Sequence, residues 1–242
     1  MKAIAVIPAR YASTRFPGKL LEKLNGKAVL QHVYENVCAA ELFDRVCIAC
    51  DDERIYDFAK SIGAEVFMTS PELPSGTDRV AAVIYDIGWE GIVVNVQGDE
   101  PLISKAPLSA LLAAFEDETV QMASLMTVLE DFDDLDAPHI VKVVVAANDN
   151  ALYFSRSPIP FDRDGNMLLP YYRHIGVYAF RHQCLQDFVS LPLGKLEQTE
   201  KLEQLRALEY GIPLRMVYTD YQGMGIDTPE DLARVKSLLN KG

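Results

Sequence analysis

Apolar and polar positions alternate with two different periods along the first half of the chain. Four short apolar runs predict buried strands, at residues 3–7, 45–50, 65–68 and 92–96. Three segments with apolar residues at helical spacing predict helices, at residues 28–40, 52–62 and 77–87. Gly63 and Gly88 follow two of these segments, where glycine commonly ends a helix. Apolar strands separated by helices indicate a mostly parallel sheet flanked by helices.

The second half of the chain combines the two periods less regularly. Strands are predicted at residues 122–129, 141–146, 151–155, 172–180 and 214–218. Helices are predicted at residues 105–116, 181–189 and 199–210, and residues 158–169 indicate a long loop. A last helix is expected to start within 227–231, where a polar cap, a proline and acidic side chains occur together. With no repeat or linker, we expect a single α/β domain: a Rossmann-like sheet with a smaller mixed-sheet extension.

The charge balance restricts the partners. The chain has 242 residues and a formal net charge of −12. General nucleic-acid binding is excluded because neutralising phosphates needs a basic surface. No apolar run is long enough to cross a membrane, and the apolar start of the chain is followed at once by a charged loop, unlike a signal peptide. We therefore expect a cytoplasmic protein without nucleic-acid or membrane partners.

The cysteines do not indicate a zinc or redox site. There are four of them, Cys38, Cys47, Cys50 and Cys184. Cys47 and Cys50 have the spacing of a C-x-x-C motif, but they lie within a predicted strand. Residues an odd number of positions apart on a strand point to opposite faces, so these two thiols are expected to diverge. We interpret them as small buried side chains in a reducing compartment.

A basic loop follows the first predicted strand. Residues 8–19 read PARYASTRFPGK and bring three cations, Arg10, Arg15 and Lys19, into one segment of an acidic protein. This segment follows the carboxyl end of the first predicted strand, which is where α/β sheets bind ligands. Arginine grips phosphate oxygens in pairs, and lysine adds a point charge. The segment lacks the glycines and the Lys-Ser/Thr pair of known phosphate-loop motifs, so a polyphosphate site and a solvated basic loop both remain open from the charge alone.

Two aspartates are placed to hold a metal ion. Asp99 follows the predicted strand at 92–96, and Asp227 precedes the last predicted helix. Mg²⁺ prefers a few carboxylate oxygens together with substrate phosphates and water. From the residues alone, other roles than that of metal ligand remain open: Asp227 also fits a helix cap, and Asp99 also fits a turn.

Several ordered motifs together resemble the sugar-acid cytidylyltransferases, and most closely the 3-deoxy-manno-octulosonate (Kdo) cytidylyltransferases. Besides residues 8–19 they are Pro74–Arg79, Val94–Pro101, Ala151–Arg156, Arg173–Tyr178, Leu202–Arg206 and Gly225–Asp231. The motifs extend over nearly the whole chain, which makes their combination far more specific than any one of them. The resemblance implies transfer of CMP from CTP to the anomeric hydroxyl of Kdo, with release of pyrophosphate, for lipopolysaccharide biosynthesis.

The resemblance also implies roles for individual residues. Nucleotide binding is expected from Pro8, Ala9, Arg10, Ser13, Arg15, Lys19, Ser75, Gly76, Arg79, Gln97 and Asp99. The sugar acid is expected to contact Gln97, Lys142, Arg156, His174, Tyr178, Glu203 and Gln204. The catalytic set would be Arg10, Arg15, Lys19, Asp99 and Asp227, with Mg²⁺ on the two aspartates. For His174, a catalytic base and a hydrogen-bonded core histidine both remain open.

The resemblance also bears on domain organisation, on assembly and on the choice of acceptor. The single domain 1–242 would place the nucleotide and metal at approximately 1–130 and 210–242. The sugar acid and a homodimer contact around 172–180 would lie at approximately 131–209. An 8-amino Kdo analogue is one alternative acceptor, because Gln198 departs from the pattern of some relatives. A sialic acid is another, because an enzyme that activates it would share the basic loop. A non-catalytic nucleotide-binding module is the alternative of another class.

Overall fold

The computed structural model describes residues 1–13, 15–166 and 170–240, so Thr14 of the basic loop and the end of the predicted loop at 158–169 lie outside the described residues. The chain divides into two compact units. Unit 1 contains residues 1–108 and 223–242, and unit 2 contains residues 109–222. The expected single-domain organisation stays a prediction.

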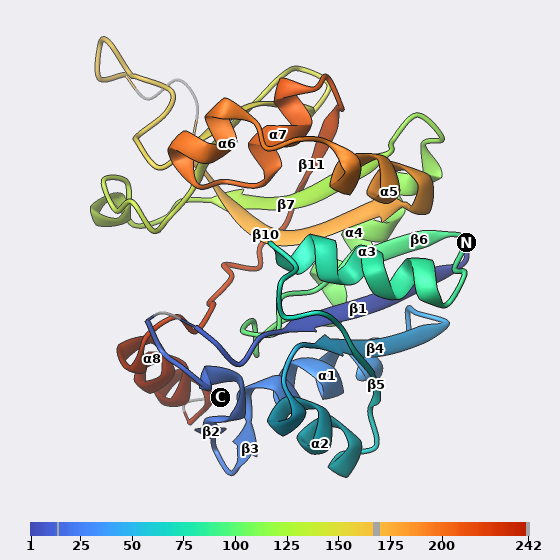
Figure 1. Ribbon diagram of the computed structural model, residues 1–242. Helices are drawn as coiled ribbons and strands as arrows, with labels where there is room; N and C mark the ends of the chain where they lie inside the picture. Colours follow the sequence, from blue (N-terminus) through green and yellow to red (C-terminus); the bar gives the residue numbers. More distant parts are fainter. Residues whose placement is uncertain (14, 167–169, 241–242) are drawn as a thin grey trace. The chain divides into compact units, whose positions relative to one another are not determined.

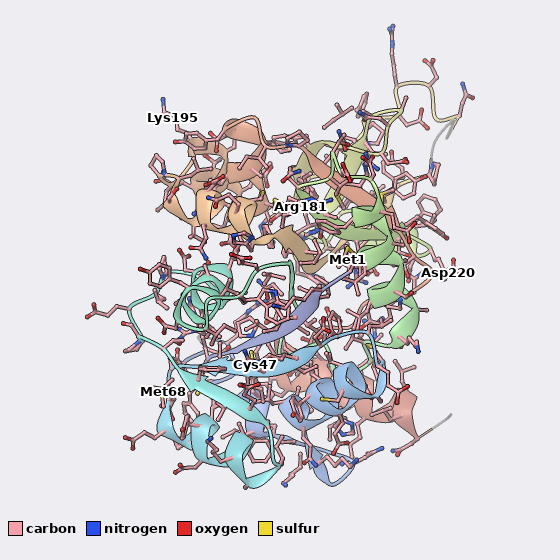
Figure 2. The ribbon with its side chains drawn as sticks, turned by 90° about the vertical axis from the view of Figure 1, so that its right-hand side faces the viewer. Met1, Cys47, Met68, Arg181, Lys195 and Asp220 are labelled. Carbon is pink, nitrogen blue, oxygen red and sulfur yellow. The ribbon has the colours of Figure 1, made fainter. Side chains whose placement is uncertain are left out.

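Unit 1 is built on a parallel sheet. Its strands are β1 (Ala3–Ala9), β4 (Arg45–Cys50), β5 (Glu65–Met68) and β6 (Ile92–Asn95). They lie in the order β6-β1-β4-β5, and every pair is parallel. All seven residues of β1 are buried, as expected for a central strand covered on both faces. Figure 2 labels Cys47 on β4 and Met68 at the end of the edge strand β5.

The helices of unit 1 connect these strands. They are α1 (Val29–Ala39), α2 (Glu53–Ser61) and α3 (Gly76–Asp86). The C-terminal α8 (Pro229–Leu239) also belongs to unit 1, whereas α4 (Lys105–Ala113) begins in unit 1 and ends in unit 2. The chain moves outward through β1, β4 and β5 and then returns to β6, so right-handed crossovers place α1 and α2 on one face and α3 on the other. Figure 1 shows α3 on the opposite side of β1 from α1 and α2.

Short elements surround the basic loop. A 3₁₀ turn, η1 (Lys19–Leu21), follows the loop, and a hairpin of β2 (Lys23–Leu24) and β3 (Lys27–Ala28) leads into α1. The sequence pattern did not predict this turn or this hairpin, because each strand has only two residues and shows no period.

Unit 2 carries a mixed sheet. Its strands are β7 (Met122–Val128), β8 (Lys142–Val145), β9 (Ala151–Ser155), β10 (Tyr172–Arg181) and β11 (Leu214–Tyr218). β7 is parallel to β11 and antiparallel to β10, whereas β8 is antiparallel to both β9 and β10. A β-bulge interrupts the β10–β7 register between Ile175 and Tyr178.

The helices of unit 2 differ from the predicted pattern at one place. α5 (His182–Ser190), α6 (Lys195–Glu200) and α7 (Gln204–Glu209) lie together on one side of the unit 2 sheet (Figure 1). The single helix predicted at 199–210 is wrong, because Lys201 adopts a left-handed conformation with φ of 55° and separates α6 from α7. Two further 3₁₀ turns are η2 (Ala114–Glu116) and η3 (Phe132–Asp134).

The α/β fold with a mostly parallel mixed sheet and flanking helices is confirmed. Cys47 and Cys50 are buried and form no disulfide, and burial is the main cause that raises the pKa of Cys47 to about 12 and that of Cys50 to about 11. No described helix has the length and hydrophobicity needed to span a bilayer.

Candidate nucleotide site

A pocket of about 270 Å³ lies at the carboxyl ends of β1 and β6 in unit 1. Its lining residues come from the end of β1, the basic loop, the start of α3 and the segment after β6. They are Pro8, Arg10, Ala12, Ser13, Lys19, Leu20, Gly76, Gln97, Gly98 and Asp99. This is the edge of a parallel sheet at which ligands bind. Most of the residues predicted to bind the nucleotide therefore surround one cavity.

Tyr11 organises the basic loop. Its backbone carbonyl accepts hydrogen bonds from Ser13 N at 3.1 Å and from Gly18 N at 3.0 Å. Gly18 has a φ of 72°, and a Cβ atom there would lie 3.2 Å from the Tyr11 ring. Glycine is favoured at this point both by the backbone conformation and by the close approach of the ring. Lys19 follows directly, so its position is set by this turn.

Lys19 joins the two predicted metal ligands. Its Nζ atom lies 2.6 Å from Asp99 Oδ2 and 2.8 Å from Asp227 Oδ1. Arg15 Nη2 reaches the other oxygen of Asp227 at 2.7 Å. The structure thus brings together four of the five predicted catalytic residues, and the fifth, Arg10, lines the same pocket and donates to the Leu73 carbonyl at 2.9 Å.

The charges in this cluster shift one another's pKa values. Burial lowers the pKa of Lys19, but the two carboxylates outweigh it and the net shift is upward. Burial raises the pKa of Asp227, but its bond to Lys19 and the Arg15 charge outweigh it and the net shift is downward. Both groups therefore stay ionised at neutral pH.

The cap of α8 leaves the Asp227 carboxylate available. Thr228, one residue later, caps the helix: its hydroxyl accepts from Asp231 N at 3.2 Å. Asp231 in turn accepts from Thr228 N at 2.9 Å and from Asp227 N at 3.0 Å. This reciprocal capping box holds the backbone of Asp227 and directs its side chain to Lys19 and Arg15. A helix cap, one of the two roles that the sequence left open, belongs to Thr228.

The donor set fits a magnesium ion. Asp99 and Asp227 offer carboxylate oxygens within reach of a single ammonium group, and Mg²⁺ takes one or two carboxylates together with substrate phosphates and water. Within the described residues no group of three or more His, Cys, Asp or Glu side chains surrounds a common point. Asp99 and Asp227 are therefore the two side chains of this cluster that could contribute ligands to a divalent ion.

The start of α3 forms another wall of the pocket. Ser75 caps the helix by accepting from Asp78 N at 3.1 Å, and Gly76 begins it. A Cβ atom on Gly76 would lie 3.3 Å from Pro8 Cγ, so a larger residue would crowd the pocket. Gln97 also lines the pocket and donates to Asn95 Oδ1 at 3.3 Å. The amides of a helix N-terminus favour a negatively charged guest.

Four residues predicted to bind the nucleotide do not line this pocket: Ala9, Arg15, Ser75 and Arg79. Ala9 ends β1, and Arg15 is turned to Asp227. Arg79 is completely buried, and it pairs with Asp51 and donates to the Thr69 hydroxyl. Three pocket residues, Ala12, Leu20 and Gly98, were not in the predicted set; small residues within or beside the matched motifs were the available signal for Ala12 and Gly98.

Three predicted sugar-acid residues form a buried network in unit 2. Tyr178 Oη donates to Gln204 Oε1 at 3.1 Å, and Gln204 Nε2 lies 3.4 Å from His174 Nδ1. His174 Nε2 lies 2.9 Å from Ser124 Oγ, which also reaches the Val177 carbonyl. Burial is the main cause that lowers the pKa of His174 to about 3, with the charge of Arg173 adding to it. A ring with so low a pKa is a weak base, and both of its nitrogens already have partners, so the hydrogen-bonded core histidine is favoured over a catalytic base.

Lys142 and Arg156 are tied to backbone carbonyls. The buried Nζ of Lys142 donates to Ala137 O at 3.1 Å, Ile140 O at 2.7 Å and Arg156 O at 2.5 Å. An ammonium has three protons, so these acceptors use all of them. The Arg156 guanidinium donates to the carbonyls of Pro138, Glu200 and Lys201. Glu203, the remaining predicted contact, is half-buried at the start of α7.

A sequence model described as "Cytidylyltransferase" matches residues 4–217. The chain belongs to the cytidylyltransferase family. A 3-deoxy-manno-octulosonate cytidylyltransferase of Solibacter usitatus is 49% identical over 98% of this chain and 94% of its own length. An 8-amino-3,8-dideoxy-manno-octulosonate cytidylyltransferase of Shewanella frigidimarina is 45% identical over 99% of each chain.

A solved structure extends the likeness of this cytidylyltransferase to three dimensions. The structure of a CMP:2-keto-3-deoxy-manno-octonic acid synthetase complexed with CTP superposes with a TM-score of 0.94. It is 39% identical to this chain and covers 100% of it and 99% of its own length. Nucleotidyltransferases of this kind typically use a divalent metal ion.

Proposed function

We propose that this protein transfers CMP from CTP to the anomeric hydroxyl of Kdo, giving CMP-Kdo and pyrophosphate. The observation that carries the proposal is the pocket of unit 1, where the basic loop, Asp99 and the start of α3 meet. Four full-length relatives named 3-deoxy-manno-octulosonate cytidylyltransferase support the proposal, and they are 46–49% identical to this chain.

The residues of the pocket match the charge changes of the reaction. Attack on the α-phosphorus moves negative charge onto the departing pyrophosphate, and catalysis consists of positioning and electrostatic stabilisation. Arg10, Arg15 and Lys19 supply the fixed cations for this charge. Asp99 and Asp227 orient Lys19 before the nucleotide arrives.

Mg²⁺ is the proposed cofactor, with Asp99 and Asp227 as the residues that would hold it. When bound, the ion neutralises phosphate charge and activates the attacking hydroxyl. No side-chain base is then needed, in keeping with the low pKa of about 3 of His174.

The sugar acid is proposed to contact residues of unit 2 together with Gln97. Arg156, Tyr178, Glu203 and Gln204 are the proposed direct contacts. Lys142 and His174 are proposed to act through the backbone and the network that they hold, because all three Lys142 protons and both His174 ring nitrogens are engaged. A guanidinium, a phenol oxygen and a side-chain amide keep further hydrogen-bonding capacity beside the partners that they already have.

The alternative acceptor is the 8-amino analogue of Kdo. The observation in its favour is the relative from Shewanella frigidimarina, which is named for that substrate and is 45% identical over the same length. A sialic acid is the more distant alternative. A non-catalytic nucleotide-binding module is disfavoured because both Asp99 and Asp227 are present and both contact the ammonium group of Lys19.

We also propose a cytoplasmic homodimer. A reaction that consumes CTP points to the cytoplasm. Unit 2 exposes large apolar side chains that a partner subunit would cover, among them Leu152, Phe161 and Leu193. Light scattering at micromolar concentration should give the mass of two chains, and a clean monomer would contradict the dimer.

The proposed reaction is tested by pyrophosphate release with Mg²⁺ and CTP. Kdo, 8-amino Kdo, N-acetylneuraminate and glucose-1-phosphate are offered separately, with UTP as the nucleotide control. Release with CTP and Kdo supports the proposal. Release with 8-amino Kdo alone would replace the acceptor, and silence with every acceptor in a protein that binds CTP would favour the non-catalytic alternative.

A further inference from the structure

Two charged side chains outside the pocket, Asp51 and Arg54, contact Tyr11, the organising residue of the basic loop. β4 ends at Cys50, and the next residue, Asp51, accepts a hydrogen bond from Tyr11 N through Oδ1 at 3.2 Å. The guanidinium of Arg54 lies over the Tyr11 ring, 3.3 Å from its centroid. Asp52 orients Arg54 through two bonds of 2.8 and 2.7 Å. Asp51, just after β4, therefore holds the backbone of Tyr11, and Arg54, in the first turn of α2, holds its ring.

The buried side chain of Arg79 holds Asp51 in place. It is 0% exposed, and its Nη2 lies 3.1 Å from Asp51 Oδ2, the oxygen that Tyr11 does not use. Nη1 donates to the Thr69 hydroxyl and to the Ser70 carbonyl, just beyond β5. These contacts hold the guanidinium on Asp51, and removing one partner of such a buried pair leaves an uncompensated charge. Arg79 thus connects the ends of β4 and β5 to the loop.

The position of Tyr11 determines the positions of pocket residues. Its carbonyl accepts from Ser13 N and Gly18 N, and its ring lies against Gly18. Ser13 lines the pocket, and Lys19 is bonded directly to Gly18 and lines it too. A shift of Tyr11 therefore moves the polar groups that face a polyphosphate.

We infer that Asp51, Arg79 and Arg54 are positioning residues that act through Tyr11 on the part of the site that binds the β- and γ-phosphates. The inference rests on the proposed function, because it assumes that the basic loop receives a polyphosphate. It gives Arg79 a role without contact with the nucleotide, whereas direct contact by Arg79 would also affect the nucleoside monophosphate. The two roles differ in which ligand loses affinity.

The test compares inorganic pyrophosphate and CMP by titration calorimetry on the full chain. The double variant Asp51→Asn/Arg79→Gln removes both buried charges together, so that neither is left unpaired. We expect pyrophosphate to bind about tenfold more weakly, as for a misplaced set of charged hydrogen bonds, while CMP affinity changes less than about twofold. The KM for CTP should rise in parallel, with the KM for the sugar acid unchanged.

Arg54→Ala tests the same loop from the surface, where folding is not at risk, since the Arg54 side chain is 59% exposed. Loss of the stack on Tyr11 should weaken pyrophosphate binding about threefold, again without an effect on CMP.

Asp44→Ala is the matched control. Asp44 directly precedes β4, whereas Asp51 directly follows it. Asp44 accepts a hydrogen bond from Ala3 N at 2.8 Å, at the end of β1 opposite to the basic loop. This variant removes a bond of the same kind without touching the loop and should bind both ligands like the wild type. If pyrophosphate and CMP lost affinity equally, or if neither test variant lost affinity for pyrophosphate, the inference would be overturned while the proposed function would stand. A wild-type protein that bound neither CTP nor pyrophosphate would overturn the proposed function, and this inference with it.

Discussion

Lys19 Nζ lies 2.6 Å from Asp99 Oδ2, so the carboxylate proposed for the metal already carries a bound cation. The same ammonium reaches Asp227 Oδ1 at 2.8 Å. A metal ion and Lys19 therefore compete for the same oxygens until a polyphosphate offers Lys19 another anionic partner. This relationship links metal binding to nucleotide binding.

Lys19→Met should strengthen metal binding by the nucleotide-free protein. Removing the competing charge is expected to lower the dissociation constant for Mn²⁺, used as a probe for Mg²⁺, by about tenfold. Pyrophosphate should bind more weakly to the same variant, because a cation for the phosphates is lost. Electron paramagnetic resonance of free Mn²⁺ measures the first effect, and an unchanged Mn²⁺ affinity would contradict the competition.

Asp227→Asn should abolish turnover with little effect on stability. The carboxylate contacts Lys19 and Arg15, whereas α8 is capped by Thr228 and would stay intact. Thr228→Ala is the contrasting variant: loss of the cap should cost about 1 kcal/mol of unfolding free energy. Urea unfolding and pyrophosphate release on both variants separate the two roles. A large stability loss in Asp227→Asn would assign this residue to the fold instead.

His174 should make the protein sensitive to acid without controlling the pH dependence of turnover. Its pKa is about 3 in the folded protein against an ordinary value of 6.5. Between these values the unfolded chain binds the extra proton, so stability is complete above pH 6.5 and falls as the pH decreases, by up to about 1.4 kcal/mol per pH unit.

The His174→Gln variant checks this expectation. Its unfolding free energy should depend less on pH than that of the wild type when urea unfolding is compared at pH 7.5 and pH 5. An inflection of kcat near pH 6.5 that the variant loses would identify His174 as a base after all.

Lys142→Met should lower stability more than it alters the use of substrate. The change leaves three backbone carbonyls without their charged donor, at a cost of about 3 kcal/mol. Lys195→Met is the control, because Lys195 is exposed and its side chain points away from the fold (Figure 2). Thermal unfolding and the KM for the sugar acid are measured on both. A stable Lys142 variant with a raised KM would instead support direct contact with the sugar acid.

The regular elements were largely predictable from the sequence because their signals are local. The predicted strands at 151–155 and 214–218 match β9 and β11, and the buried strands of unit 1 match within a residue or two. The break between α6 and α7 was not predictable, because it depends on a lysine in a left-handed conformation without a glycine or proline to mark it.

The candidate site was predictable in its residue types but not in its contacts. Lys19 and Asp227 are 208 positions apart, and their pairing depends on how the chain returns to unit 1 through α8. The sequence likewise could not show that the protons of Lys142 are all used by carbonyls, or that Arg79 lies beneath the loop rather than in the pocket. Such facts follow from packing, which periodicity and charge do not report.

Phosphorus magnetic resonance of the complete reaction shows whether CMP passes from CTP to Kdo. The wild-type protein is mixed with CTP, Mg²⁺ and Kdo, and the phosphorus signals are followed over time. We expect the signals of inorganic pyrophosphate and of a single phosphodiester, that of the CMP-sugar, to grow equally while the CTP signals decline. CTP that stays intact, or that breaks down to CDP and inorganic phosphate, would contradict transfer of CMP to this acceptor.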